Sequence, residues 1–377
     1  MTKRVLITAG PVYGRLDDNK LVSNRVRGIW AVRFARHLYE QGFYITLIIP
    51  DTMGVDSDLE NRYGFQIFRH SGFYDYERLC VEQAPRHSAA IMAAAVVNWI
   101  PSAPIRGKMP TKQYKPGDVI QVPFTLAPYV IDQMKKANPR LTLIGCKMLV
   151  GSEESELISA AYGVLLKAKC HAVVANDMAK GLKRKLIVNK DRSVQVFDDD
   201  FKGFYDTLVS LIHDDYYQTR LRSKPERESS PADQIFDGLV SKHQYRFLPV
   251  EGGRVFGALL VRCPKSKGWL VSPREKGEAF TADDAVLVLE TDWLSLSLTV
   301  SGKIKASLNA PLLIRYSEEY NLDSVLHFHE QVSGLPTLPY APPGTGRDSH
   351  RPLDKLDLSQ GFNIEGHGCF LPGSTPC

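Results

Sequence analysis

An amphipathic segment flanked by two apolar ones constrains the start of the chain more than any other feature. Residues 4–10 (RVLITAG) and 44–50 (YITLIIP) have the continuous apolar character of buried β-strands. Between them, residues 24–41 repeat apolar side chains at helical spacing and stop at Gly42. A strand, a helix and a strand in this order predict a βαβ unit, in which two parallel strands share a sheet that helices cover.

The same alternation continues along the first half of the chain. Residues 89–97, 140–146 and 171–177 are further apolar, strand-like segments, and residues 154–169 have the pattern of an amphipathic helix. We therefore predict an α/β domain over residues 1–214, built on a doubly wound sheet; the family resemblance described below implies that this sheet is Rossmann-like.

The composition changes after this region. Residues 215–233 are rich in Pro, Ser and mixed charges, which is typical of a linker. Residues 234–377 contain short strand-like runs, such as GALLVRC and AVLVLET, and one clear helical pattern at 311–320. The sequence predicts an α+β second domain with a mostly antiparallel sheet.

The composition argues against several classes of protein. No apolar run reaches the roughly 18 residues of a membrane span, and the N-terminus lacks the apolar core and cleavage site of a signal peptide. The 6 cysteines form no CxxC pair, which indicates a reducing compartment. A net charge of +5 is too small to indicate nucleic-acid binding, but it fits a protein that handles phosphates. We expect a cytoplasmic protein with no nucleic-acid or membrane partner.

Polar residues follow the first predicted strand. In open α/β sheets, ligands bind at the carboxyl ends of the strands, where helix N-termini meet anions. Gly10 ends the strand, and a long loop then leads to Asn24, Arg25 and Arg27 at the start of the helix. These residue types suit a phosphate or an acyl-phosphate. The alternative is a solvated loop in which Asp17 or Asn24 caps a helix.

Two other strand ends carry comparable groups. The alanine-rich strand at 89–97 is followed by Asn98 and, ten residues later, by Lys108 in a Pro/Gly-rich loop. A lysine in such a loop can reach triphosphate oxygens, although an ordinary exposed lysine is the alternative. The strand at 171–177 ends in Asn176 and Asp177, again a polar pair at a carboxyl edge.

The motifs VLITAGP, VSN before a helix, AAAVV with a lysine beyond it, LIGC and VVAND together resemble the phosphopantothenoylcysteine synthetase family, the phosphopantothenate–cysteine ligases of coenzyme A synthesis. The resemblance covers roughly residues 3–212. It implies an acid–amino-acid ligase that uses CTP or ATP with Mg²⁺, joins a small carboxylate to an amine, and forms a homo-oligomer. It also implies that Asn24 stabilises an acyl-nucleotide intermediate and that Lys108 contacts the phosphates and the reacting carbonyl, so that both are catalytic. The implied nucleotide-binding residues are Gly10, Asn98, Lys108, Cys146, Lys167 and Asn176.

Three positions depart from the family pattern. Val26-Arg27-Gly28 stands where the family has Ser-Ser-Gly, Asn98 stands where it has Asp, and Cys146 replaces an aromatic residue. A changed substrate, a changed nucleotide and lost activity are all compatible with these departures.

Three histidines mark the second domain. His327 and His329 are two residues apart in a strand-like run, so they share one face, and His367 lies in a later turn. Three imidazoles predict a site for Zn²⁺ or another divalent metal with an open position. The alternative is a partly exposed histidine pair without a metal.

Residues 236–373 resemble the class II aldolase/adducin family, in which an H-x-H and a distant His-Gly hold zinc or a related ion. The resemblance implies that His327, His329 and His367 are metal ligands in an aldolase-like domain. The family has a catalytic Glu before the H-x-H, but no Asp or Glu occurs between Trp293 and Ser317 here. The nearest counterpart is Asn309, so we expect aldol chemistry to be lost.

Three interpretations of the whole chain stay open. The first is a ligase fused to a divergent metal-binding domain. The second is a metal-dependent aldolase or lyase with a nucleotide-binding accessory domain. The third is a non-catalytic fusion.

Overall fold

The computed structural model describes residues 3–54, 58–181, 183–222, 230–247, 249–250, 253–263, 268–301 and 305–373. Contacts divide the chain into two compact units. The first comprises Met1–Lys190 and Val194–Ile212, and the second comprises Asp191–Ser193 and His213–Cys377. Within the described residues, no helix is both long and apolar enough for a membrane span.

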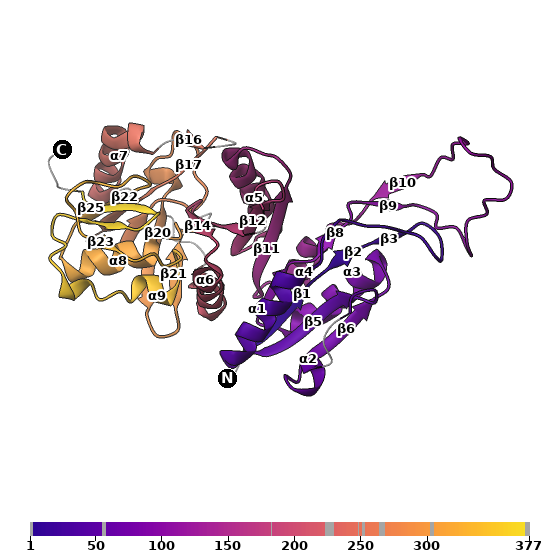
Figure 1. Ribbon diagram of the computed structural model, residues 1–377. Helices are drawn as coiled ribbons and strands as arrows, with labels where there is room; N and C mark the ends of the chain where they lie inside the picture. The colour runs from indigo at the N-terminus through magenta and orange to yellow at the C-terminus, as the bar shows by residue number, and fades with distance from the viewer. Residues whose placement is uncertain are drawn as a thin grey trace. The chain divides into compact units, whose positions relative to one another are not determined.

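A mostly parallel sheet forms the centre of the first unit (Figure 1). Its eight described strands are, in spatial order, β14 (Val194–Asp198), β13 (Arg184–Asn189), β12 (Ala172–Asp177), β11 (Thr142–Leu149), β7 (Ala89–Met92), β1 (Arg4–Thr8), β5 (Tyr44–Pro50) and β6 (Gln66–His70). The run from β12 to β6 is parallel, and β13 and β14 are antiparallel additions. The parallel strands have the order of a Rossmann-like sheet, with the topological switch between β1 and β7. The predicted doubly wound α/β fold is confirmed.

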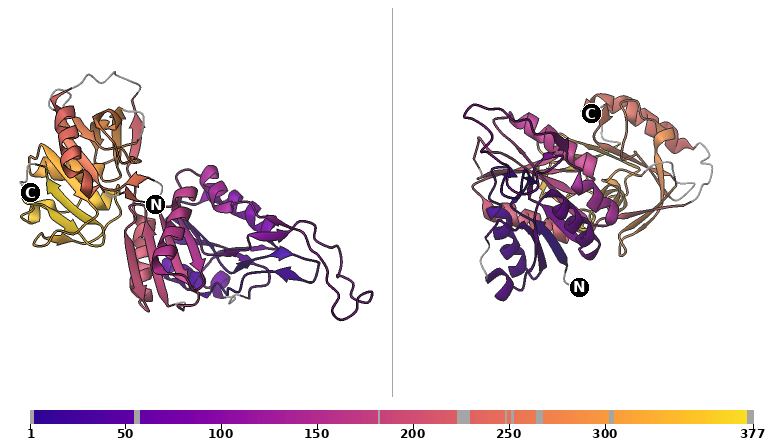
Figure 2. Two further views of the ribbon diagram at one scale, coloured as in Figure 1. Left: turned by 90° about the horizontal axis from the view of Figure 1, so that it is seen from above. Right: turned by 90° about the vertical axis from the view of Figure 1, so that its right-hand side faces the viewer.

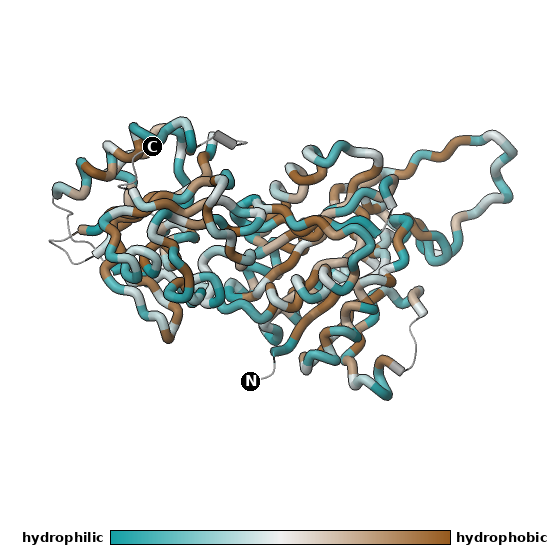
Figure 3. Tube along the Cα trace, turned by 60° about the vertical axis from the view of Figure 1, so that its left-hand side comes forward, coloured by the Kyte–Doolittle hydropathy of each residue, from teal (hydrophilic) through white to brown (hydrophobic). Residues whose placement is uncertain are grey.

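Helices cover both faces of this sheet. Helices α1 (Ile29–Glu40) and α6 (Phe201–His213) share one apolar cluster with alternate strand residues such as Val5 and Ile7. The other face carries α3 (Phe73–Gln83), α4 (Val130–Ala137) and α5 (Glu154–Ala168). The remaining short helices are α2 (Asp58–Asn61) and η1 (Ala84–Arg86). In Figure 3 the strand segments inside each unit are mostly brown, the colour of hydrophobic residues. Strands that are buried on both faces need such residues along their whole length.

The first helix begins later than predicted. The pattern indicated a helix from residue 24, but α1 starts at Ile29 after Gly28, which has a left-handed φ of 69°. A Cβ at Gly28 would lie 2.3 Å from the backbone nitrogen of Gly10 and 2.7 Å from its Cα. The helix start therefore packs directly on the backbone that follows β1, and residues 24–27 stay outside the helix.

Short strand pairs and a long arm extend from the carboxyl edge of the sheet. The predicted strand at 89–97 is interrupted, because β7 ends at Met92 and β8 (Ala95–Val96) pairs with β2 (Pro11–Val12). Next to them, β3 (Gly14–Arg15) pairs with β4 (Leu21–Val22). The chain then leaves through β9 (Trp99–Pro101) and returns through β10 (Phe124–Leu126), which together form the base of the arm (Figure 2).

An antiparallel sheet with two parallel edge pairs forms the second unit. Its nine described strands are, in spatial order, β15 (Gln218–Leu221), β21 (Ser297–Ser301), β20 (Val286–Asp292), β19 (Gly268–Val271), β18 (Ala258–Cys263), β22 (Ser324–Phe328), β25 (Gly368–Pro372), β24 (Phe362–Ile364) and β23 (Thr337–Leu338). Helix α7 (Pro231–His243) packs on one face and α8 (Ala310–Glu319) on the other. The remaining elements are β16 (Pro249–Val250), β17 (Arg254–Val255), α9 (Gly346–Ser349), η2 (Gln244–Arg246), η3 (Ala282–Asp284) and η4 (Leu353–Lys355). The predicted α+β arrangement matches these layers.

Two elements of the second unit were not predicted from the sequence, which indicated a linker over residues 215–233 and few helices after it. Strand β15 occupies part of 215–233 and pairs in parallel with β21 at the edge of the sheet. An edge strand with exposed side chains needs no apolar run, so composition did not reveal it. Helix α7 begins with a capping box between Ser230 and Asp233, which the proline-rich composition concealed.

Substitution of Gly28 tests the contact between α1 and Gly10. Alanine at Gly28 and at Gly42 would both occupy left-handed backbone, which costs about 1–2 kcal/mol. Only Gly28 would also force a clash, because a Cβ at Gly42 meets nothing within 4 Å. We expect Gly28→Ala to lower the free energy of unfolding by about 1–3 kcal/mol more than Gly42→Ala does in denaturant titrations. Equal losses in the two variants would contradict this packing.

Candidate functional sites

The topological switch point of the first sheet carries the first predicted residues. Ala95 donates its backbone N–H to the Gly10 carbonyl at 3.0 Å, so β8 continues the pairing of β1 and β7 beyond their ends. The Asn24 side-chain amide donates to the carbonyls of Val96 at 2.9 Å and Ala95 at 3.3 Å. Gly10 and Asn24 therefore lie together at the carboxyl ends of β1 and β7, where doubly wound sheets bind ligands.

The loop after β1 holds the Lys108 loop in place. The buried Asp17 carboxylate accepts the Met109 N–H at 2.9 Å, and Asp18 accepts the Gly107 N–H at 2.8 Å. Hydrogen bonds hold the pKa of Asp17 below its ordinary value, and the bond from the Met109 N–H contributes most to this lowering. Lys108 is exposed between these two anchored residues. The sequence indicated a phosphate site in this loop, and the carboxylates in it instead position the neighbouring lysine loop.

The start of α1 is electropositive. Arg25 and Arg27 are exposed just before the helix, and the described first turn of α1 holds no acidic residue. The positive end of the helix dipole favours anions, so two arginines beside it are unfavourable unless an anion is bound. This combination suits a phosphate group.

The other predicted residues lie further along the carboxyl edge. The Asn98 carbonyl accepts the Ala127 N–H at 2.7 Å at the base of the arm. Cys146 lies half-buried in β11, and burial raises the pKa of its thiol to about 12. Asn176 is buried at the end of β12, opposite Met148 of β11.

Asp177, next to Asn176, organises the loop after β11. Its carboxylate accepts backbone N–H groups of Gly151 at 2.9 Å, Ser152 at 2.6 Å and Ala179 at 2.8 Å. These bonds lower the pKa of Asp177 and keep the carboxylate charged; the bond from Gly151 contributes most. The carboxylate is thereby occupied in shaping the loop.

Lys167 is not brought together with these residues. Helix α5 leads into the start of β12, so its last turn lies at the amino ends of the strands, opposite the edge that carries Asn176. The Lys167 ammonium lies 4.5 Å from the centre of the Tyr129 ring, a cation–π contact. The family motif aligned only loosely near Lys167, so the sequence did not show at which end of α5 a phosphate-binding lysine would lie.

A buried histidine near the same edge was missed by the sequence. His70 ends β6, is fully buried, and neither ring nitrogen has a hydrogen-bond partner among the described residues. Its ring lies 5.9 Å from that of Tyr13, which donates a hydrogen bond to Asp51, and 5.4 Å from that of Tyr76. Burial lowers the pKa of His70 to about 4. No spacing in the sequence gave a signal, because these groups come from separate elements and loops.

The three predicted histidines of the second unit do meet. One ligand nitrogen from each of His327, His329 and His367 lies within 4.8 Å of the others. His327 faces the Cys369 carbonyl through Nδ1 at 2.9 Å, which leaves Nε2 free for a metal. A Cβ at Gly368 would lie 2.0 Å from the Phe328 carbonyl, so only glycine lets the His367 turn approach β22 this closely.

The donor set fits a divalent metal. Burial, followed by the neighbouring imidazoles, lowers the pKa of His327 well below its ordinary value, and burial does the same for His367. Both rings are therefore neutral at pH 7, the form that binds metals. The His327 Nε2 atom is buried and has no hydrogen-bond partner among the described residues, as expected for a ligand atom.

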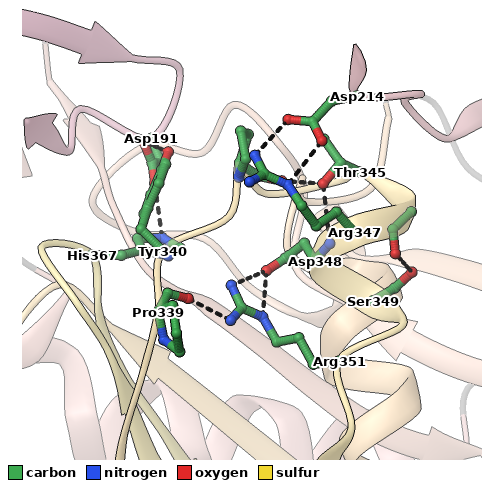
Figure 4. Close-up of polar contacts among 12 residues, drawn as sticks. Asp191, Asp214, Pro339, Tyr340, Thr345, Arg347, Asp348, Ser349, Arg351 and His367 are labelled. Carbon is green, nitrogen blue, oxygen red and sulfur yellow. Dashed lines mark hydrogen bonds and ion pairs between the residues drawn. The ribbon is translucent and has the colours of Figure 1, made fainter. Parts of the chain in front are cut away.

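Polar side chains lie beside His367 (Figure 4). Asp191 Oδ2 lies 3.2 Å from His367 Nε2, and the Tyr340 hydroxyl donates to Asp191 at 3.5 Å. Close by, Asp348 accepts two hydrogen bonds from Arg351 at 3.0 and 3.1 Å. The sequence did not single out Asp191, since it lies more than a hundred residues before the histidines.

Asn309 occupies the position where the class II aldolase resemblance predicts a proton-abstracting carboxylate. Asn309 precedes α8, is buried, and its Oδ1 has no hydrogen-bond partner among the described residues. A carboxamide cannot serve as a general base at neutral pH. The cluster can hold a metal, but Asn309 cannot supply the proton transfer that aldol cleavage needs.

The first unit is thus a doubly wound α/β domain with Gly10 and Asn24 together at its switch point. The family model of the DNA/pantothenate metabolism flavoprotein C-terminal domain matches residues 1–203, more than half of the chain. The chain therefore belongs to this family.

One curated relative is the coenzyme A biosynthesis bifunctional protein CoaBC of Thermococcus kodakarensis, which is 29% identical over 177 residues, or 47% of this chain and 41% of the relative. The chain spans about two fifths of the length of the curated relatives it matches. Among solved structures, the DNA/pantothenate metabolism flavoprotein of Streptococcus pneumoniae is 18% identical, with a TM-score of 0.47 over 55% of this chain and 97% of that one. L-fuculose-1-phosphate aldolase of Thermus thermophilus is 15% identical, with a TM-score of 0.27 over 38% of this chain and 82% of that one. The aldolase-like character of the second unit stays a prediction.

The buried His70 predicts a pH dependence of stability. Its folded pKa of about 4 lies below the ordinary value of 6.5, so below pH 6.5 the unfolded chain takes up a proton that folded His70 does not. Stability therefore falls on acidification, by about 2 kcal/mol at pH 5. Melting curves at pH 7 and pH 5 should show a smaller drop for His70→Leu than for the unmodified protein. The exposed His350, replaced by Leu, is the control and should leave the drop unchanged; an unchanged drop in His70→Leu would refute the assignment.

Proposed function

We propose that the first unit is a nucleoside-triphosphate-dependent ligase that joins a carboxylate to an amine, with phosphopantothenate and cysteine as the leading substrates. The observation that carries this proposal is the meeting of Gly10 and Asn24 at the switch point. The loop that joins them anchors the Lys108 loop through Asp17. Membership of the pantothenate-metabolism family and the coenzyme A role named in the curated relatives support it.

The residues match the charge that such a reaction develops. In the first step a substrate carboxylate attacks the α-phosphate of CTP or ATP, and pyrophosphate leaves. In the second step the amine attacks the acyl-nucleotide and releases the nucleoside monophosphate. Both steps build negative charge on oxygen atoms, which cations and N–H donors held in place stabilise. Lys108 and the arginines before α1 would supply the cations. The Asn24 side-chain amide would donate to the intermediate in place of the Val96 and Ala95 carbonyls, to which it donates in this structure.

Magnesium would enter with the triphosphate, since Mg²⁺ usually binds through substrate phosphates and retains several waters. Cys146 and Asn176 would line the far side of this edge, and Asn98 the base of the arm. The homo-oligomer that the family resemblance implies stays a prediction. The exposed apolar side chains of the arm, which include Trp99, Val119 and Leu126, are the surface that it would bury.

Pyrophosphate release tests the ligase. The protein with CTP or ATP, Mg²⁺, phosphopantothenate and cysteine should release pyrophosphate. Lys108→Ala should lower kcat/KM by about 100-fold or more, because it removes a cation from the developing charge. Asp17→Asn should weaken nucleotide binding, because the carboxylate anchors the Met109 end of the lysine loop. Asn24→Ala should slow turnover more than it weakens nucleotide binding.

Lys112→Ala is the matched control for Lys108→Ala, because Lys112 is an exposed lysine of the same arm. It should behave as the unmodified protein does. Absence of any nucleotide-induced rise in melting temperature, with Mg²⁺ present, would rule out the nucleotide site.

For the second unit we propose a divalent metal, with zinc favoured, held by His327, His329 and His367, without aldolase activity. The convergence of three imidazoles, two of them buried and neutral, supports the site. The metal would place a positive charge inside this buried, polar cluster. Asn309 stands where a catalytic carboxylate is expected, so no general base is present at that position.

Metal analysis tests this second proposal. Protein purified without chelators should contain about one metal per chain, and the His327→Ala/His329→Ala double variant should contain none. His350→Ala should keep its metal, since His350 lies outside the cluster. Cleavage of sugar phosphates should stay at background in all three proteins. Metal-free unmodified protein would refute the site, and robust cleavage would refute the inactivity.

A further inference from the structure

A buried carboxylate from outside the aldolase-like segment faces the three histidines. Asp191 lies in the chain between β13 and β14, yet the segment Asp191–Ser193 belongs to the second unit by its contacts. Its Oδ2 atom lies 3.2 Å from His367 Nε2. Figure 4 shows the two side chains directed toward one another.

The contact has the spacing of two ligands on one metal ion. Zinc–ligand bonds of about 2.0–2.1 Å in a tetrahedron put neighbouring ligand atoms about 3.3 Å apart. The contact does not have the angles of a hydrogen bond, and neither ring nitrogen of His367 has a hydrogen-bond partner among the described residues. The pair is close enough to share an ion, and a metal would supply the partner that the His367 ring lacks.

The other carboxylate oxygen of Asp191 is held by its own turn. Oδ1 accepts the Ser193 hydroxyl at 2.7 Å and the Ser193 N–H at 3.1 Å. These bonds fix the side chain, and Oδ2 is directed at His367 with the Tyr340 hydroxyl 3.5 Å away. Asp191 is 5% exposed and His367 4% exposed, so solvent does little to screen the carboxylate. A buried carboxylate needs a cation or several hydrogen bonds to remain charged.

We propose that Asp191 is the fourth protein ligand of the metal held by His327, His329 and His367. The inference rests on the metal site proposed above and adds its coordination. Four protein ligands close a tetrahedral zinc site, and closed sites are structural, whereas catalytic sites keep a position for water or substrate. The metal would then hold the segment Asp191–Ser193 to the turn that carries His367.

Cobalt substitution of the full-length protein tests this closure. Co²⁺ replaces zinc and reports its coordination in the visible spectrum. Azide binds metals that have an open position. We expect the spectrum of the unmodified Co²⁺ protein to be unaffected by azide. The spectrum of Asp191→Ala should differ and should change further when azide is added.

Metal affinity supplies a second readout. Loss of a residue that only orients a ligand typically weakens metal binding 10–100-fold. Loss of a direct ligand should exceed about 100-fold, and we expect this for Asp191→Ala. Glu365→Ala is the control, because Glu365 is an exposed carboxylate two residues before His367. It should keep the spectrum and the affinity of the unmodified protein.

The outcomes separate this inference from the metal site itself. An azide response in the unmodified protein would show an open position and overturn the role of Asp191, while the three-histidine site would stand. A loss below 100-fold with an unchanged spectrum would make Asp191 a positioning residue and would also overturn the inference. Failure of the unmodified protein to bind any metal would overturn both proposals. If Asp191→Ala does not fold, the azide titration of the unmodified protein decides alone.

Discussion

Close approach of two backbone segments at a glycine positions each of the two candidate sites. At Gly28 the start of α1 rests on the backbone of Gly10, and at Gly368 the turn that carries His367 rests on the carbonyl of Phe328. Any side chain at either position would separate the segments, because a Cβ would lie 2.3 Å and 2.0 Å from the neighbouring backbone atoms. Asn24 and His367, four residues and one residue away from these glycines, take their places from these contacts.

Two carboxylates of the first unit, Asp17 and Asp177, hold loops. Asp17 accepts the N–H at one end of the Lys108 loop, and Asp177 accepts three N–H groups around the loop after β11. Such bonds keep a carboxylate charged and remove it from acid–base chemistry, because its lone pairs are occupied. The ligase reaction proposed here needs no side-chain nucleophile, so a site made of amides, cations and backbone is chemically sufficient.

The two units differ in how they depart from the families that they resemble. In the first, Gly10 and Asn24 are kept at the switch point, while Val26-Arg27 beside them and Asn98 and Cys146 further out depart from the family pattern. In the second, the three histidines of the resemblance are present and meet, and Asn309 stands where a proton-transferring carboxylate is expected. A metal with four protein ligands fits that loss, since a closed site has no need of a base.

Local patterns along the sequence determined much of this protein. The buried strands at 44–50 and 171–177, the parallel βαβ order, and the face shared by His327 and His329 follow from side-chain periodicity, which depends only on near neighbours. The carboxyl edge of a parallel sheet also predicted the meeting of Gly10 and Asn24, since it is a rule of topology.

Only the tertiary structure decided which distant groups meet. It placed Asp191 against His367, separated Lys167 from Asn176, and buried His70 between tyrosines from other elements. No spacing in the sequence encodes these relations, because they depend on the register and direction in which whole elements pack. Strand β15 and helix α7 escaped detection for a related reason. Edge pairing and a capping box stabilise them, and neither requires the apolar runs by which buried elements are recognised.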